Sequence, residues 1–218
     1  CRGELCFVIG MSEPGSGSDL FAAKTRATKA DGGWRINGTK IFTSNGVIAD
    51  FITVAAKTDP AAGARGISLF LVDKATPGFT VSRRLEKFTT HCSDTAELAL
   101  QDVFVPDECH LSGGGGGMKA YESLTVDRIF TAALALGAGR AAYDLASRYA
   151  KERAQFGKPI ASFQAVQFKL VDMLSTLEQA RLYTYHAARL ADRGMPITKE
   201  AALAKIIAGD GCNEVARK

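Results

Sequence analysis

The stretch GMSEPGSGSD, Gly10 to Asp19, combines the residue types best suited to cradle a ligand. Short serine hydroxyls alternate with glycines, which let the backbone approach an anion or the edge of a ring. A dinucleotide-binding loop is excluded, because the third glycine is missing and the neighbouring segments predict β-hairpins rather than βαβ units. Taken alone, the same composition is equally typical of a solvent-exposed turn.

Two carboxylates, Glu13 and Asp19, belong to this loop. We interpret them as groups that fix the loop, by pairing with a base or by capping backbone N–H groups, rather than as acid–base catalysts. Lys40 is a candidate partner for one of them. The hydroxyls and backbone N–H groups of the loop would then be its binding groups.

The composition excludes several classes of function. The 218 residues carry a net charge of +4 with acids and bases interspersed, so no basic run marks a nucleic-acid surface. No apolar stretch is long enough to span a bilayer, and the three dispersed histidines predict no metal site. Five scattered cysteines predict free thiols in a reducing compartment. We favour the bacterial cytoplasm, because no targeting segment is visible, and the mitochondrial matrix stays open.

The first half of the chain, residues 1–111, predicts an antiparallel β-sandwich or barrel. Asn37-Gly38 is the dipeptide most typical of a two-residue hairpin turn, so Trp34–Gly46 is expected to hold two short strands. Clusters of β-branched and aromatic residues predict further strands at Phe51–Thr58, Gly66–Lys74, Gly78–Arg84 and Ala96–Pro106. Short strands at such regular intervals favour a sandwich or barrel over a βαβ sheet.

A run of glycines, Ser112–Gly117, predicts a joint, after which the apolar period becomes helical. Helices are expected over Tyr121–Lys151 and Ser162–Gly194, with Ser162 and Gly194 as caps, and a third is expected from a Thr198 cap onward. Residues 112–218 therefore predict an up-and-down helical bundle, and the whole chain an α+β protein of two domains. Because the chain begins at Cys1 and ends within a predicted helix, we expect it to be part of a longer protein.

Several segments together resemble the acyl-CoA dehydrogenase family: GMSEPGSGSDL, INGTKIFTSNG, CSDTAELALQDVFVP and, above all, YAKERAQFGKPIASFQAV. The similarity extends over essentially the whole chain in order. It implies a middle β domain followed by most of a C-terminal helical bundle, and FAD as the cofactor. It also implies a homodimer or homotetramer.

The resemblance assigns roles to residues of the β half. Met11 and Ser12 match positions that border the flavin ring, and Ser18 matches a position near the pyrophosphate and the acyl-CoA. Phe42 matches an aromatic position beside the ring, where tryptophan is common, and Ser44 matches a hydroxyl that faces flavin N5. Without the resemblance, Phe42 and Ser44 would be interpreted as ordinary strand core and strand edge.

In the helical half, Arg153, Gln155 and Phe156 match a segment that reaches the FAD of a neighbouring subunit. The planar guanidinium of arginine suits a pyrophosphate, because it pairs with two oxygens at once. Gln164 matches a further polar contact near the adenosine part of FAD. From the residues alone, Arg153 would be a surface residue beside Glu152, and Gln164 a solvent-exposed residue at a helix N-terminus.

The catalytic base is open at this stage. Most family members place a glutamate farther downstream than Lys218, and a minority place it where Asp127 stands, although Asp is one methylene shorter. Otherwise Asp127 would be an acid at a helix N-terminus. Arg128 matches a residue that contacts the substrate near its CoA moiety, and His91, where arginine is usual, is a further possible base without support.

The resemblance implies α,β-dehydrogenation of an acyl-CoA thioester to a trans-2-enoyl-CoA, with electrons passed to an electron-transferring flavoprotein. An acyl-CoA oxidase or a flavin monooxygenase of the same fold is an alternative, distinguished by reaction of the reduced flavin with oxygen. A third alternative is a flavin- or CoA-binding module that has lost its base.

Overall fold

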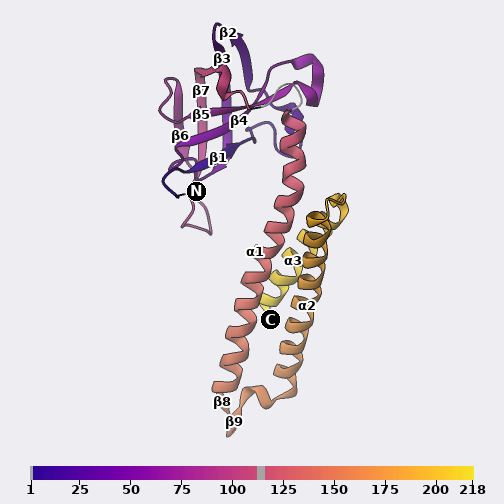
Figure 1. The fold of residues 1–218 in the computed structure, drawn as a ribbon. Helices are drawn as coiled ribbons and strands as arrows, with labels where there is room; N and C mark the ends of the chain where they lie inside the picture. Colours follow the sequence, from indigo (N-terminus) through magenta and orange to yellow (C-terminus); the bar gives the residue numbers. More distant parts are fainter. Residues whose placement is uncertain (1, 112–115) are drawn as a thin grey trace. The chain divides into compact units, whose positions relative to one another are not determined.

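The computed structural model describes residues 2–111 and 116–218 (Figure 1). The chain separates into two compact units, Cys1–Ala120 and Tyr121–Lys218, and each is described by itself. Within the described residues, no helix is both long enough and apolar enough to cross a membrane.

The first unit is one curled sheet of seven strands (Figure 1). The strands are β1 (Phe7–Gly10), β2 (Arg26–Ala30), β3 (Gly33–Ser44), β4 (Phe51–Lys57), β5 (Ile67–Asp73), β6 (Phe79–Arg84) and β7 (Thr95–Pro106). Their order is β1-β4-β2-β3-β7-β6, and β5 also pairs with β4. The pairs β1–β4 and β2–β4 are parallel and the others antiparallel. The predicted β domain is therefore confirmed, but its sheet is mixed rather than purely antiparallel.

The predicted hairpin at Asn37-Gly38 is wrong, because β3 runs through it without a turn. Gly38 is needed for close approach: a Cβ there would lie 2.3 Å from the hydroxyl oxygen of Thr25. The side-chain oxygen of Asn37 accepts a hydrogen bond from the N–H of Asp102 at 2.8 Å, which holds a bulge in β7. The turn lies instead at Asp31–Gly32, between β2 and β3.

The bulge at Asp102 explains the apolar pattern of β7. Leu98 and Leu100 are buried on one side of it and Val103 and Val105 on the other, so the alternation changes phase between them. An extra residue in one strand shifts the side-chain alternation by one position. Both halves of β7 therefore face the same core.

Three helices in alternating direction make up the helical part: α1 (Gly116–Glu152), which belongs to the second unit from Tyr121 onward, α2 (Gln164–Asp192) and α3 (Thr198–Arg217) (Figure 1). A short hairpin, β8 (Ala154–Gln155) and β9 (Lys158–Pro159), joins α1 to α2. Alanines dominate the core where the helices meet: Ala132, Ala180, Ala187, Ala201, Ala204 and Ala208 are fully buried. Small side chains let helix backbones approach closely, and the predicted up-and-down bundle is confirmed.

Two of the predicted helix caps are wrong. The Ser162 hydroxyl donates to the carbonyl of Pro159, and α2 begins at Gln164 without a side-chain cap. Thr198 is the first residue of α3 rather than its cap. Gly194, at φ 68°, does end α2 in the left-handed conformation that glycine favours. Of the glycine run, residues 112–115 lie outside the described residues, and Gly116 and Gly117 already belong to α1.

Candidate functional site

A buried ion pair anchors the loop Gly10–Asp19 to the sheet. Lys40 points from β3 into the protein, with its side chain 0% exposed, and its Nζ lies 2.8 Å from Oε1 of Glu13, which is 6% exposed. The Glu13 carboxylate also accepts the N–H groups of Lys24 at 2.5 Å and Thr25 at 3.1 Å. The expectation that Glu13 fixes the loop, with Lys40 as partner, is confirmed.

The surroundings of this pair shift both pKa values. Burial alone would raise the pKa of Glu13, but the hydrogen bonds from Lys40, Thr25 and Lys24 outweigh burial, and the pKa lies below its ordinary value of 4.5. Burial lowers the pKa of Lys40, and the Glu13 carboxylate opposes that shift. The geometry favours the charged form of Glu13, because three donors bind its carboxylate.

Beyond Glu13, the loop closes on itself. Glu13 and Ser16 exchange two backbone hydrogen bonds, of 2.8 and 3.0 Å. Asp19 accepts the N–H of Ala22 at 3.2 Å and so caps the short 3-10 turn Leu20–Ala22, as expected for a carboxylate that stabilises the loop. Ser18 lies between these contacts with its side chain exposed.

The carbonyl groups of Met11 and Ser12 are hydrogen-bonded to the protein, whereas, among the residues that the structure describes, their N–H groups are not. The Met11 carbonyl accepts a hydrogen bond from Lys40 Nζ at 3.2 Å, and the Ser12 carbonyl accepts one from the N–H of Ile41 at 2.9 Å. Neither the Met11 N–H nor the Ser12 N–H donates to an acceptor within residues 2–111 and 116–218. Both residues are half-buried, so the site offers two adjacent donors that are ready for an electron-rich partner.

Phe42 lies beside these donors in an unusual conformation. The register of β3 against β7 shifts between Lys40 and Thr43, and Phe42 occupies this bulge at φ 59°. Phe42 is 67% exposed, and the N–H of the preceding Ile41 donates to the Ser12 carbonyl. The left-handed backbone conformation is strained for a residue with a bulky side chain, and such strain is concentrated at functional sites. The structure therefore brings together Met11, Ser12 and Phe42, three of the residues selected from the sequence.

A second network holds the turn that follows Ser44, a residue whose side chain is exposed at the end of β3. The carbonyl of buried Asp94 accepts the N–H of Asn45 at 2.8 Å, and its carboxylate accepts the N–H of Val47 at 2.9 Å. The Ser93 hydroxyl donates to the Asn45 side chain at 2.9 Å. These roles were not predicted from the sequence, where the one signal is the polar pattern of CSDT, Cys92 to Thr95.

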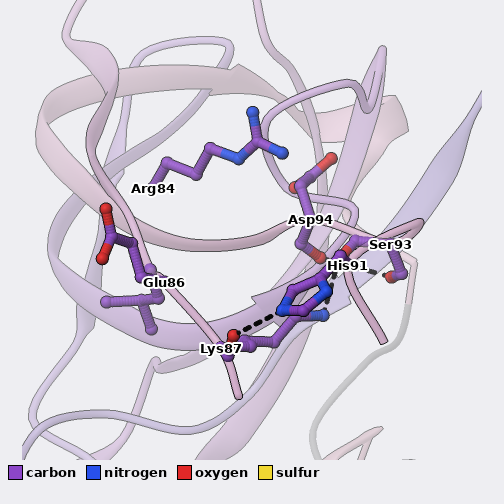
Figure 2. A pocket seen from close by; sticks show the side chains of 7 residues that line it. Arg84, Glu86, Lys87, His91, Ser93 and Asp94 are labelled. Atoms are coloured by element: carbon purple, nitrogen blue, oxygen red, sulfur yellow. Dashed lines mark hydrogen bonds between the residues drawn. The ribbon is translucent and has the colours of Figure 1, made fainter. Parts of the chain in front are cut away.

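Ser93 and Asp94 also border a polar pocket of about 530 Å³ (Figure 2). Its other lining residues are Arg84, Leu85, Glu86, Lys87 and His91. His91 lies on the exposed loop, with Nε2 2.9 Å from the carbonyl of Lys87. The Lys87 ammonium in turn donates to the carbonyl of Ser93 at 2.6 Å, so these two contacts brace the wall of the pocket.

In the helical unit, the other candidates form two separate groups. Asp127 is exposed on α1, and its carbonyl accepts a hydrogen bond from the Thr131 hydroxyl. Because α1 begins at Gly116, Asp127 lies three turns inside it, and the alternative of a helix N-terminal acid is wrong. Arg128 is half-buried and donates to Thr125 at 3.3 Å.

The second group surrounds the hairpin of β8 and β9. Arg153 and Gln155 are exposed, and Phe156, at its tip, is 92% exposed with φ 54°. Gln164, also exposed, is the first residue of α2. Asp127 and Glu152, the last residue of α1, are 25 residues apart, which corresponds to about 38 Å of helix, and Arg153 follows Glu152 directly. The two sets of residues are therefore too far apart to contact the same small ligand.

Comparison with known proteins identifies the family of each unit. The model of the acyl-CoA dehydrogenase middle domain matches residues 8–103, and that of the acyl-CoA dehydrogenase C-terminal domain matches residues 114–218. The chain belongs to the acyl-CoA dehydrogenase family. Curated relatives named as acyl-CoA dehydrogenases are 44–45% identical, and the chain spans 53–55% of their length.

Three solved structures illustrate the similarity. Butyryl-CoA dehydrogenase from Megasphaera elsdenii is 43% identical with a TM-score of 0.93, over 97% of this chain and 56% of that one. A chain solved in work on the electron transferring flavoprotein of Acidaminococcus fermentans is 42% identical with a TM-score of 0.94, over 98% and 57%. PigA, solved with FAD and proline, is 33% identical with a TM-score of 0.92, over 98% and 56%.

Proposed function

We propose that the protein is an FAD-dependent acyl-CoA dehydrogenase that converts an acyl-CoA to its trans-2-enoyl-CoA. The observation that carries the proposal is a pair of N–H groups, at Met11 and Ser12, that meet no acceptor within residues 2–111 and 116–218. A buried ion pair fixes their loop, and Phe42, nearby on β3, has a strained left-handed backbone. On this reading residues 1–111 form the middle β domain and residues 112–218 the C-terminal bundle.

The residues of the β unit fit a flavin. Two adjacent N–H donors suit the electron-rich edge of the ring, and the exposed Phe42 offers a flat apolar surface beside it. The Ser44 hydroxyl is proposed to hydrogen-bond at N5, and Ser18 to contact pyrophosphate and substrate. PigA, a relative of known structure, is solved with FAD, which supports this cofactor. When bound, the flavin supplies hydride acceptance from the substrate's β-carbon.

The exposed hairpin of β8 and β9 is proposed to serve a second subunit. Arg153, Gln155, Phe156 and Gln164 would contact the FAD of a neighbouring copy, because about 38 Å of α1 separates Asp127 from Glu152, the residue before Arg153. The proposal therefore includes a homodimer or homotetramer. The fork of Arg153 suits a pyrophosphate, and the exposed ring of Phe156 gains burial in such a contact.

A carboxylate must remove the substrate's α-proton. Asp127 is a candidate on α1, while most of the family uses a glutamate farther along the protein than Lys218. Arg128, one residue after Asp127, is proposed to contact the CoA moiety. A base must lie within hydrogen-bond reach of its proton, so an Asp127→Asn variant that retains activity would assign the base elsewhere.

The proposed electron acceptor is an electron-transferring flavoprotein, in keeping with the solved relative from work on that protein in Acidaminococcus fermentans. An acyl-CoA oxidase or a monooxygenase would instead return electrons to oxygen. The proposed location is the bacterial cytoplasm or the mitochondrial matrix, both of which are reducing.

The test is an anaerobic visible spectrum of the complete protein before and after addition of acyl-CoAs of several chain lengths. Bleaching of the flavin absorbance by one length class supports the proposal and names the substrate. Reoxidation by an electron-transferring flavoprotein but not by air then separates a dehydrogenase from an oxidase. A flavin that stays oxidised with every acyl-CoA contradicts the proposal.

A further inference from the structure

We propose that Lys40 is a positioning residue that fixes and polarises the peptide between Met11 and Ser12, and so strengthens the Ser12 N–H as a donor to the flavin ring. The inference rests on the proposed function, because it assigns the flavin as the acceptor. It adds a residue that the resemblance did not associate with the cofactor.

The argument begins with the geometry of a single peptide group. The carbonyl of Met11 and the N–H of Ser12 belong to one planar trans unit, so they point in opposite directions. The Lys40 ammonium lies 3.2 Å from the carbonyl oxygen of that unit, on the protein side. The Ser12 N–H consequently points away from Lys40, and no acceptor meets it within the described parts of the chain.

Water screens the charge of Lys40 little, although the Glu13 carboxylate at 2.8 Å offsets part of its field at that peptide. The Lys40 side chain is 0% exposed, and an ammonium in such surroundings acts more strongly than in water. A cation on a carbonyl oxygen draws electron density toward that end of the peptide and makes the N–H at the other end a better donor. The next peptide is fixed as well, because the Ser12 carbonyl accepts the N–H of Ile41.

Stability alone gives little reason for such a pair. Two charges lose their hydration when they are buried, and well-packed apolar residues of similar volume are often as stabilising. The Glu13 carboxylate keeps Lys40 charged at this position, and its contacts with the N–H groups of Lys24 and Thr25 tie the pair to the chain that follows the loop. The ion pair therefore holds the positively charged Lys40 ammonium against the Met11 carbonyl of the binding loop.

The test compares the complete protein with the double variant Glu13→Gln/Lys40→Met, which removes both charges and leaves no unpaired ion. The single variant Glu13→Gln retains Lys40 on the Met11 carbonyl, so it distinguishes the effect of Lys40 from that of Glu13. Lys29→Met is the matched control, because Lys29 pairs with Asp107 on the exposed surface of the same sheet. The readouts are the dissociation constant for FAD and the midpoint potential of the bound flavin.

The double variant is expected to bind FAD about three- to tenfold more weakly, the range of one weakened hydrogen bond. Its midpoint potential should fall, because the reduced ring is richer in electrons and gains most from a strong donor. Glu13→Gln should lie between the double variant and wild type, and Lys29→Met should match wild type. A double variant with unchanged potential and affinity overturns this inference alone, whereas a wild-type protein that binds no flavin overturns the proposed function together with it.

Discussion

Replacing Lys40 by methionine should destabilise the β unit far more than the loss of a surface ion pair. The change leaves Glu13 charged and buried, with its 2.8 Å partner removed. Breaking one side of a buried pair costs about 3–5 kcal/mol. We expect a value near 3 kcal/mol, because the N–H groups of Lys24 and Thr25 still bind the carboxylate. Urea unfolding of the complete protein, followed by tryptophan fluorescence to which Trp34 contributes, measures the change.

Lys29→Met is again the control, because the side chains of Lys29 and Asp107 are 55% and 52% exposed and their pair contributes at most about 1 kcal/mol. Adding Glu13→Gln to Lys40→Met should recover part of the loss, because the unpaired charge is then gone. The reasoning is refuted if Lys40→Met loses no more stability than Lys29→Met, or if the double variant is less stable than the sum of the two single changes predicts.

Three further predictions concern the same unit. The pKa of Glu13 in the folded protein lies below 4.5, so the unfolded chain binds the Glu13 proton more tightly. The contribution of Glu13 to stability is therefore present above pH 4.5 and is lost as the pH falls through the folded pKa. Urea midpoints measured from about pH 6 to about pH 3 should fall less steeply for Glu13→Gln than for wild type. Phe42→Gly should relieve a left-handed backbone conformation that costs about 1–2 kcal/mol. Thermal unfolding should therefore show unchanged or higher stability, while FAD binding weakens. The opposite pattern would make Phe42 a structural residue. Asp94→Ala should lower stability by about 1–3 kcal/mol, because the Val47 N–H loses its acceptor. Hydrogen exchange at the Val47 amide should become faster, and equal protection in the variant and wild type would contradict this role of Asp94.

The elements of the fold were largely predictable from sequence, because their signals are local. The strands from Phe51 to Arg84 follow clusters of β-branched and aromatic residues, and the helices follow a helical apolar period. That β3 continues through Asn37-Gly38 without a turn was not predictable from local chemistry, because Gly38 is required by the close approach of Thr25, thirteen positions away. Asn37 likewise supports a bulge in a strand that is distant in sequence.

The candidate site was predictable in part. The pairing of Glu13 with Lys40 followed from their chemistry, since a carboxylate on a tight loop needs a cation or backbone donors. The role of Asp94 could not be derived, because its partners Asn45 and Val47 lie about fifty residues earlier and meet it only in the folded sheet. The strain at Phe42 was equally invisible, because it arises from a register shift between two strands.

Analysis of the acyl-CoA product by mass spectrometry tests the central claim most directly. The complete protein is mixed without oxygen with acyl-CoAs of several chain lengths, in amounts close to its flavin content. The account predicts a product lighter than one of these substrates by two hydrogen atoms, formed in proportion to the flavin that is reduced. Acyl-CoAs that return unchanged at every chain length, although the flavin is present, would contradict it.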